Sequence, residues 1–510
     1  MDLVPKPSLV EKQFWLLDIS GEEVDGVEQI WVWGIDEEGH PCILVDKGQK
    51  TRFYIAFDDK DDAVEAKKKF GEVLKKQGEH VELTLKEMKR LGKPVYTVEV
   101  NCQPRDLQNL SKRASEIFGE RKIFEDDIRF SQRFLIDQDI VPSNWHLATA
   151  EKICDKKGID FYAMQGLKRL DLERPPKLMV MGFDAIYYSK VGEADPERDP
   201  VAIISLHSRE GEVWQYNLEE GEKKILEEFI EVIGRYDPDV LVGFEANSIH
   251  WSYLLKRAER YGVSLAVGRL EREPHQSLYG HFSVAGRINF DLNDYTTEIT
   301  AIERKTLEEL ATYLGISMDG VEAVDPFLHS RKWVEDRESL LKYSEWRAEV
   351  MVKAFELISD HVLSLSSTTG IPTDYVQTAS PGFRLDNYIM REASKTGELI
   401  PKPRDGYSPS YTGGRVLSPI PGLHSNIAVV DFKALYPSLM VKHNISPDTV
   451  VTPPFPSGED ILIVPEVEVG ILQRRKGFFT EILKRIMEKR EETRQRMKRF
   501  SKGTADYKLL

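Results

Sequence analysis

The sequence predicts a multidomain protein of the α/β and α+β classes. Its 510 residues exceed what a single hydrophobic core usually serves. The first part of the chain alternates strand-like segments with polar helices, and the next part alternates short β-branched strands with amphipathic helices. The hydrophobic share of 41% and the charged share of 30% are ordinary for a soluble globular protein.

The first predicted domain covers residues 1–176 and has α+β character. Alternating apolar residues indicate strands, and a polar stretch with helical periodicity indicates a helix. The expected strands are 29–33, 80–84 and 95–100, and the expected helix is 61–77. A linker is expected at 170–176, because its consecutive prolines oppose both helix formation and strand pairing.

The second predicted domain covers residues 177–357 and is an α/β layer structure. Its short β-branched runs lie between helices, which is typical of a sheet covered by helices. The expected strands are 177–184, 201–206, 240–244 and 288–292, and the expected helices are 223–236 and 252–261. The first of these strands ends in an acidic residue, Asp184.

The remaining sequence divides into three predicted parts. Residues 358–400 form a helical connection with a helix at 357–367, residues 401–473 form a further domain, and residues 474–510 contain a long helix at 478–500. On this last helix, apolar residues form one stripe and basic residues recur every four positions on another face. The apolar stripe is Phe479, Ile482, Leu483, Ile486 and Met487, and the basic residues are Arg490, Arg494 and Lys498.

Composition limits where the protein acts. No run approaches the roughly 18 apolar residues of a membrane helix, and the N-terminus has no signal-peptide pattern, so a cytoplasmic protein without a membrane partner is expected. Cys42, Cys102 and Cys154 lack the spacing of a disulfide framework or a zinc site. The net charge of −15 is unusual for a nucleic-acid binder, but local rather than overall charge governs phosphate contacts.

One segment carries a pattern that points to chemistry. Residues 427–438 read Ile-Ala-Val-Val-Asp-Phe-Lys-Ala-Leu-Tyr-Pro-Ser, and the β-branched residues predict a buried strand that ends at Asp431. Pro437 opposes a long uninterrupted helix after it. A lone aspartate at a strand end is usually structural, but Tyr436-Pro-Ser follows directly and Tyr411-Thr-Gly-Gly414 lies just upstream.

These motifs, together with His443-Asn-Ile-Ser-Pro-Asp-Thr449, resemble those of the family B DNA polymerases, most closely the archaeal ones. The resemblance implies a family B N-terminal domain at 1–176 and an RNase H-like exonuclease-type domain at 177–357. It also implies a partial palm at 401–473 and partial fingers at 474–510. It covers nearly the whole chain, but only the N-terminal two thirds of a family member.

The chemistry of polymerisation explains the residue types around Asp431. Its hard oxygen ligand suits Mg²⁺, which neutralises charge on a transferring triphosphate. The backbone N–H groups from Phe432 to Leu435 can cradle phosphate oxygens. The resemblance implies that Tyr436 packs under the incoming sugar and excludes a 2′-OH, and that Arg490 contacts the triphosphate with its fixed fork of donors.

Three further residues are assigned by the resemblance to DNA binding. The turn formed by Tyr411, Gly413 and Gly414 lies near the template strand in the family. Adjacent glycines permit close approach of the backbone. By themselves, two adjacent glycines are also compatible with an ordinary turn.

The exonuclease motifs, in contrast, are degenerate. The family's Asp-x-Glu reads Asp184-Ala-Ile186, the second acid is replaced by His250, and the third is replaced by Arg347. Two metal ions need a cluster of carboxylates, and here three of four acids are lost and one is replaced by a cation. We therefore expect no exonuclease activity, with Asp184 and Asp291 serving as remnants or hydrogen-bonding residues. His250 is either a metal ligand or, more commonly for an isolated histidine, a structural residue.

The sequence contains neither an Asp-Thr-Asp motif nor the Asn-Ser-x-Tyr-Gly motif of the second fingers helix. The favoured hypothesis is the large N-terminal piece of a split polymerase that adds dNTP to a primer 3′-OH without proofreading. A C-terminal subunit would supply the carboxylates that share two Mg²⁺ ions with Asp431. Primer-template DNA, dNTP and a sliding clamp are the other implied partners. A truncated longer parent stays open, and so does a catalytically inactive polymerase-derived DNA-binding or scaffold subunit.

Overall fold

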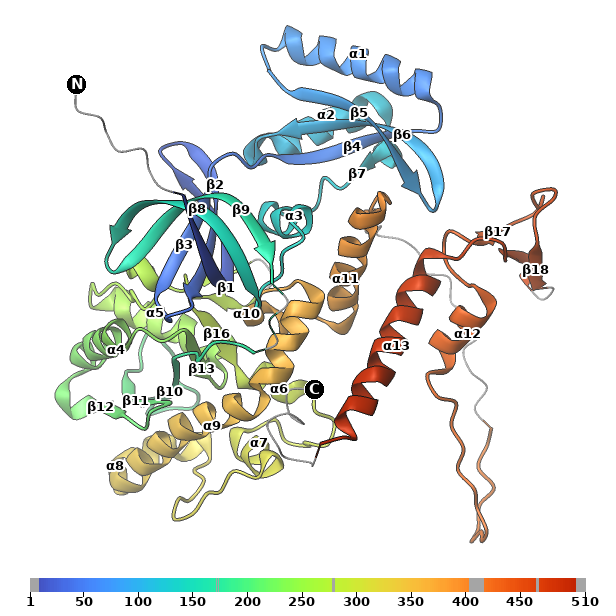
Figure 1. Ribbon diagram of the computed structural model, residues 1–510. Helices are drawn as coiled ribbons and strands as arrows, with labels where there is room; N and C mark the ends of the chain where they lie inside the picture. Colours follow the sequence, from blue (N-terminus) through green and yellow to red (C-terminus); the bar gives the residue numbers. More distant parts are fainter. Residues whose placement is uncertain are drawn as a thin grey trace, which may run out of the picture. The chain divides into compact units, whose positions relative to one another are not determined.

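The structure is a computed structural model that describes residues 9–170, 172, 174–277, 280–402, 417–464 and 467–500. The chain forms two compact units (Figure 1). The first unit contains the residues up to Gln49 and Arg129–Arg391, and the second contains Lys50–Ile128 and the residues from Glu392 onward. Each unit therefore combines two segments that are far apart in the sequence. The five-part domain division stays a prediction.

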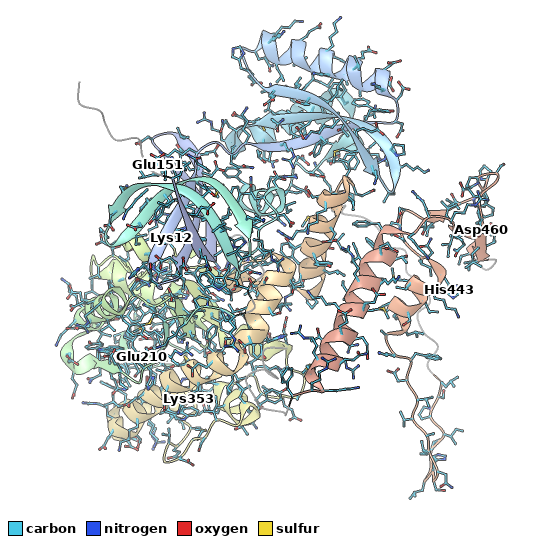
Figure 2. All side chains as sticks on the ribbon, in the orientation of Figure 1. Lys12, Glu151, Glu210, Lys353, His443 and Asp460 are labelled. Carbon is cyan, nitrogen blue, oxygen red and sulfur yellow. The ribbon has the colours of Figure 1, made fainter. Side chains whose placement is uncertain are left out.

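A closed barrel forms one part of the first unit. Its strands follow the order β1-β2-β3-β9-β8, and their inner side chains, including Phe14, Val32 and Leu44, form an apolar core. In Figure 2, Lys12 marks β1 and Glu151 marks the neighbouring β8. The strands are β1 (Leu9–Val24), β2 (Val27–Asp36), β3 (Pro41–Asp46), β8 (Trp145–Lys156) and β9 (Ile159–Arg169), and α3 (Phe130–Asp137) contacts β1.

A five-stranded sheet forms the other part of the first unit, with the order β12-β11-β10-β13-β16. Strands β10, β13 and β16 are parallel, and β11 and β12 are antiparallel to their neighbours. Residues of β10 alternate between two cores, so that Phe183 packs with α4 and α5, whereas Ile186 packs with α9. The bounds are β10 (Val180–Tyr187), β11 (Val201–Ser208), β12 (Val213–Asn217), β13 (Val240–Gly243), β16 (Ile288–Asp291), α4 (Glu222–Tyr236) and α5 (Trp251–Arg260). The four strands and two helices expected here are confirmed, with shifts at their ends.

Helix α9 (Arg337–Thr369) has 33 residues and contacts β10 and β11 along one face of the sheet. Gly182 allows this approach, because a Cβ at that position would lie 2.3 Å from the carbonyl oxygen of Ala348. The sequence predicted a helix only at 357–367. The consecutive residues 350–352 are all buried, so the helix is covered on several sides and lacks the single apolar stripe that reveals a helix in a sequence.

Smaller elements complete the first unit. The helices are α6 (Leu292–Glu298), α7 (Leu307–Leu314), α8 (His329–Glu335) and α10 (Thr373–Val376), and α11 (Pro381–Thr396) crosses the boundary between the units. A hairpin pairs β14 (His275–Gln276) with β15 (Phe282–Ser283). The short turns are η3 (Leu218–Glu220), η4 (Ala246–His250), η5 (Arg269–Glu271) and η6 (Pro326–Leu328).

The second unit begins with a four-stranded sheet in the order β5-β6-β4-β7. Helices α1 and α2 pack on it around a core that includes Phe53, Phe70 and Val98. The elements are β4 (Thr51–Phe57), α1 (Lys60–Lys76), β5 (Glu82–Arg90), β6 (Lys93–Cys102), η1 (Pro104–Asp106), α2 (Leu107–Phe118), η2 (Glu120–Lys122) and β7 (Ile123–Phe124). The structure thus confirms the expected helix at 61–77 and the strands at 80–84 and 95–100, and the expected strand at 29–33 lies within β2.

The rest of the second unit contains two helices and a small sheet. The helices are α12 (Leu435–His443) and α13 (Phe478–Met497), and the sheet has the order β17-β19-β18, with β17 (Val450–Val451), β18 (Ile461–Val464) and β19 (Val469–Leu472). Helix α13 confirms the helix expected at 478–500. The cysteines are free, and within the described ranges no helix is both long and apolar enough to cross a membrane.

The strand expected immediately before Asp431 is wrong. Residues 417–432 have no regular secondary structure, and Val429 and Val430 are 92% and 90% exposed. A β-branched run becomes a strand only when a neighbouring strand accepts its backbone hydrogen bonds. The described part of the chain provides no strand that pairs with these residues.

Candidate functional site

The residues assigned to nucleotide binding lie at the beginning of α12. Asp431 and Phe432 are exposed at the end of the irregular segment, and a turn at Ala434, with a φ of 47°, leads into the helix. Leu435 and Tyr436 occupy the first helical turn. Pro437 also lies in this turn, where proline is tolerated because the N–H that it lacks has no partner within the helix.

Arg490 lies on the neighbouring helix α13. The two helices contact each other, and Lys433 Nζ is 2.8 Å from Glu491 Oε2. The hydrogen bond from Lys433 lowers the pKa of Glu491. The structure thus brings Arg490 onto the helix that pairs with the segment carrying Asp431, and its side chain is exposed. Tyr411, Gly413 and Gly414 lie outside the described residues.

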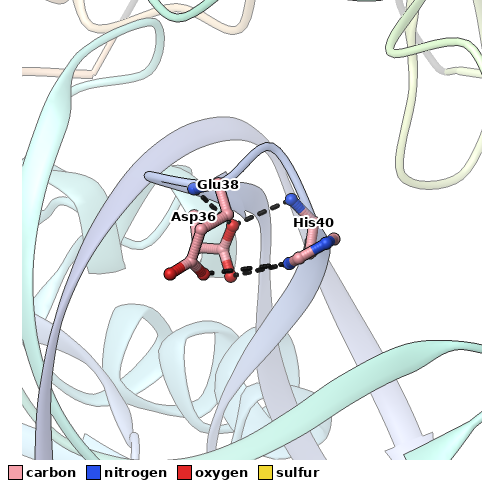
Figure 3. Close-up of side chains that lie close together, drawn as sticks. All are labelled: Asp36, Glu38 and His40. Atoms are coloured by element: carbon pink, nitrogen blue, oxygen red, sulfur yellow. Dashed lines mark hydrogen bonds and ion pairs between the residues drawn. The ribbon is translucent and has the colours of Figure 1, made fainter.

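Asp431 has the donor chemistry for Mg²⁺, but one carboxylate supplies too few ligands. In the described ranges, the one group of three side chains whose ligand atoms lie close enough to hold a metal is Asp36, Glu38 and His40 (Figure 3). Asp36 there already pairs with Lys12 at 2.5 Å and accepts the backbone N–H groups of Glu38 and His40. These bonds stabilise the turn between β2 and β3, which explains why the three side chains lie close together.

The degenerate exonuclease motifs converge at one place between β10 and α9. Arg347 Nε donates to Asp184 Oδ1 at 2.8 Å, and Ser344 Oγ donates to Asp184 Oδ2 at 2.8 Å. Both oxygens of the aspartate are therefore engaged by α9. The Asp184 side chain is 1% exposed and the Arg347 side chain is 13% exposed, so this ion pair is almost fully buried.

A second carboxylate, Glu308 on α7, completes the anionic side of this cluster. Arg347 Nη1 donates to Glu308 Oε1 at 3.0 Å, and Tyr343 donates its hydroxyl to the same oxygen at 2.6 Å. Asp184 and Glu308 raise the pKa of Arg347 well above its usual value, although burial opposes this. Burial alone would raise the pKa of Glu308, but Arg347 and the bond from Tyr343 lower it. The site therefore holds two carboxylates around a permanent cation.

The remaining degenerate positions, 186 and 250, carry no carboxylate. Ile186 is 2% exposed and belongs to the apolar core shared with α9. His250 ends the turn η4, and its Nδ1 lies 2.7 Å from the hydroxyl of Tyr187. Burial lowers the pKa of His250 to about 4, so its imidazole is neutral near pH 7. Its Nε2 is buried and has no hydrogen-bond partner among the described residues.

Asp291 has a structural place in the same domain. It accepts the backbone N–H groups of Glu245, Asn247 and Asn293, and through the last of these it caps α6. Burial raises the pKa of Asp291 to about 7, although these three hydrogen bonds oppose the shift.

Sequence reasoning missed Ser344 and Glu308. Ser344 lies one helical turn before Arg347, which is a usable signal, but Glu308 lies on another helix and has no local signal.

Comparisons with known proteins place the chain in a family. Residues 371–509 match DNA polymerase family B, and residues 121–217 and 207–310 match the exonuclease domain of DNA polymerase family B. The chain is 34% identical to DNA polymerase 2 of Aeropyrum pernix over 98% of its own length and 64% of that protein. It is 33% identical to the DNA polymerase of Archaeoglobus fulgidus over 97% of its length and 61% of that protein.

A solved structure gives the same result. The family B DNA polymerase of Pyrobaculum calidifontis matches with a TM-score of 0.87 and 32% identity, over 98% of this chain and 65% of that one. The fold thus has the architecture of a DNA polymerase with an exonuclease domain. The chain belongs to DNA polymerase family B. It spans less than two thirds of the length of these relatives.

Proposed function

We propose that this chain is the N-terminal part of a DNA polymerase that adds dNTP to a primer 3′-OH and does not proofread. The observation that carries the proposal is the position of the Arg347 guanidinium. It neutralises the charge of Asp184 and fills the space beside it. The nucleotide-binding residues are present in the same chain. Loss of one site beside retention of the other argues against general decay and supports a working polymerase.

The exonuclease-type site does not fit two metal ions. A divalent cation beside Asp184 would lie next to a buried positive charge, and both oxygens of Asp184 already accept hydrogen bonds. Ile186 offers no ligand, and its position is sealed in the core. The described residues of this site therefore leave too few free carboxylate oxygens to hold the two metal ions that such hydrolysis uses.

The polymerase site fits Mg²⁺ through Asp431, and Mg²⁺ would supply charge neutralisation for the triphosphate. The turn from Phe432 to Leu435 directs backbone N–H groups toward phosphate oxygens. Tyr436, in the first turn of α12, stacks under the deoxyribose and leaves no room for a 2′-OH. Arg490 holds the triphosphate through charge-assisted hydrogen bonds. The primer 3′-OH attacks the α-phosphorus, and pyrophosphate leaves.

Further acids must come from outside these residues, and we propose that a second polypeptide supplies them. The supporting observation is the apolar exposure of the segment before Asp431. Leu417, Ile420, Leu423 and Ile427 are all more than two thirds exposed, as are Val429 and Val430. Exposed apolar side chains along a segment without a strand partner invite pairing with strands of another polypeptide.

A co-expression experiment tests the proposal. The chain is produced together with a polypeptide that carries the Asn-Ser-x-Tyr-Gly and Asp-Thr-Asp motifs, and the complex is given a labelled primer-template. We expect extension of a matched primer with Mg²⁺ and no removal of a mismatched 3′-terminal nucleotide with Mg²⁺ or Mn²⁺. Asp431→Ala should abolish extension without dissolving the complex.

Two controls separate the possible outcomes. The triple variant Ile186→Glu, His250→Asp, Arg347→Asp restores the acids of the family motifs, so it shows whether the assay detects trimming in this scaffold. The loss of proofreading would be refuted if the unmodified complex trimmed the primer and the substitution Asp184→Ala abolished this trimming. A stable complex that stays inert with every metal would favour the scaffold hypothesis instead.

A further inference from the structure

Helix α12 ends close to the point where α13 begins. This place, which we call the joint, consists of residues 443–449 and 472–479, all within the second unit. His443, the last residue of α12, is labelled in Figure 2. The joint contains no residue that was assigned to nucleotide, metal or DNA binding, yet it connects the two helices that carry Tyr436 and Arg490.

Asn444 is the central residue of the joint. It is 3% exposed and adopts the left-handed conformation, with a φ of 59°, that ends α12. Its Nδ2 donates to the carbonyl oxygens of Leu472 and Arg475, both at 2.7 Å, and its Oδ1 accepts the N–H of Gly477 at 2.8 Å. Both N–H groups and the oxygen of this amide are thus used. Asn444 thus ends α12 with its backbone and fixes the segment that leads into α13 with its side chain.

Three of the first four backbone N–H groups of α13 are satisfied by this loop. The N-cap Gly477 has no side chain of its own to cap the helix, and a Cβ there would lie 2.5 Å from the Cβ of Ser446. Instead, Phe478 N donates to Asp448 Oδ1 at 3.0 Å, and Phe479 N donates to Ser446 Oγ at 3.0 Å. With the bond from Gly477 to Asn444, three terminal donors of α13 depend on the loop that follows α12.

The joint is also held by Arg475. Its Nη2 donates to the carbonyl oxygen of Asp448, and its Nη1 donates to the carbonyl oxygen of Gly92 at 2.9 Å. Gly92 lies in the turn between β5 and β6 and has a positive φ of 70°. A Cβ at this glycine would lie 2.4 Å from Arg475 Nη1, so the guanidinium is packed directly on the turn. The rigid four-stranded sheet therefore supports the joint.

A small rotation at the joint has a large effect at the far ends of the helices. Arg490 lies thirteen residues beyond Gly477, or about 20 Å along α13, and Tyr436 lies about 12 Å along α12 from Asn444. A change of about 15° in the angle between the helices would therefore move Arg490 by about 5 Å. The link between Lys433 and Glu491 is exposed and restrains this angle weakly.

We propose that Asn444 is a positioning residue that sets the angle between α12 and α13, and thereby the spacing between Tyr436 and Arg490 at the incoming dNTP. The proposal rests on the proposed function for the roles of Tyr436 and Arg490, but the geometric part does not depend on it. A hydrogen bond is lost when its donor and acceptor separate beyond about 3.2 Å, so a displacement of several ångströms removes the contact of Arg490 with the triphosphate. Loss of Asn444 should therefore weaken dNTP binding before it affects DNA binding.

The first experiment measures the angle without any activity. Spin labels are placed at Leu439→Cys on α12 and Lys489→Cys on α13, in a chain that also carries Cys154→Ser. The variant Asn444→Gly keeps the left-handed backbone but removes the three side-chain bonds. We expect one narrow distance distribution in the parent and a shift or broadening of about 5 Å in Asn444→Gly. Asp25→Gly replaces an exposed left-handed turn residue, and should change nothing.

The second experiment uses the co-expressed polymerase. Asn444→Gly should raise the KM for dNTP about tenfold or more, while kcat at saturating dNTP and the affinity for primer-template stay within about twofold. Asn444→Asp keeps the acceptor for Gly477, so an intermediate KM is expected. A merely structural role would lower the fraction of active enzyme, and hence kcat, at unchanged KM.

The outcomes remain distinguishable. An unchanged distance distribution in Asn444→Gly overturns the proposal, and so does an unchanged KM for dNTP in an active polymerase. If the parent complex does not extend primers, the proposed function fails, while the distance measurement still decides whether Asn444 sets the angle. If Asn444→Gly does not fold, Asn444→Asp is measured in both experiments against the same limits.

Discussion

Replacing Arg347 with methionine should destabilise the first unit by about 3–5 kcal/mol near pH 8. The structure sets this magnitude, because Asp184 is 1% exposed and its charge is balanced by the guanidinium at 2.8 Å. Methionine has similar volume and fills the space between β10 and α9. The change therefore removes the countercharge without a large cavity and leaves two carboxylates, Asp184 and Glu308, without compensation.

The loss should depend on pH in a defined direction. A buried carboxylate without a countercharge takes up a proton more readily than the same group in the unfolded chain. The folded variant then binds more protons than its unfolded state, so its deficit shrinks as the pH falls from 8 toward 5. In the triple variant Asp184→Asn, Glu308→Gln, Arg347→Met, all three charges are absent, and most of the lost stability should return at every pH.

Tryptophan fluorescence provides the assay. All eight tryptophans lie in the first unit, so their signal during urea denaturation reports on that unit alone. With an m-value of about 3 kcal/mol per molar, the midpoint of Arg347→Met should fall by about 1–1.7 M urea. Arg331→Met is a matched control, because it breaks an exposed pair with Glu335 and should cost about 0.5 kcal/mol or less.

Two results would refute this reasoning. A loss below about 1 kcal/mol at pH 8 would mean that the pair contributes no more than an exposed one. A triple variant as unstable as the single variant would mean that packing, not charge, explains the loss.

Three further changes have defined outcomes. In the reconstituted polymerase, Tyr436→Ala should raise ribonucleotide incorporation with dNTP use largely intact, and an unchanged rNTP/dNTP ratio would remove the steric role. The pKa of His250 is lowered to about 4, so the folded state binds fewer protons than the unfolded state between pH 6.5 and 4, and stability is lost as the pH falls through this window. His250→Gln should remove about 2 kcal/mol of the stability lost between pH 7.5 and 5, measured from urea midpoints at both pH values, and an equal loss in parent and variant would contradict this prediction. Gly182→Ala should cost about 3 kcal/mol or more, because its Cβ would lie 2.3 Å from the Ala348 oxygen, and wild-type stability would contradict the close approach of α9.

The sequence was informative where local pattern determines structure. The β-branched runs at 201–206 and 240–244 became strands because each pairs with neighbours on both sides. The similar run at 427–430 did not, because a strand is a property of a pair and the described chain offers it no partner. A hydrophobic pattern depends on the residues of one segment, whereas strand pairing also depends on a second segment.

The same distinction applies to the sites. The charge reversal at Arg347 was visible in the sequence and predicted a cation where a metal ion would bind. The second carboxylate that bonds to Arg347, that of Glu308, was not visible in the sequence. Only the packing of α7 beside α9 brings Glu308 Oε1 to 3.0 Å from Arg347 Nη1. Asn444 lies within the recognised motif, yet its bonds to Leu472 and Gly477 could not be read from spacing.

The guanidinium of Arg347 also has a consequence for how the first unit responds to its surroundings. Metal ions that stabilise a protein do so according to their free concentration, so chelation or starvation weakens the fold. A covalently attached cation is present at a constant ratio of one per chain and cannot be withdrawn. The stability of this unit should therefore be the same in EDTA as in excess magnesium, so that the integrity of this unit does not depend on the supply of metal ions.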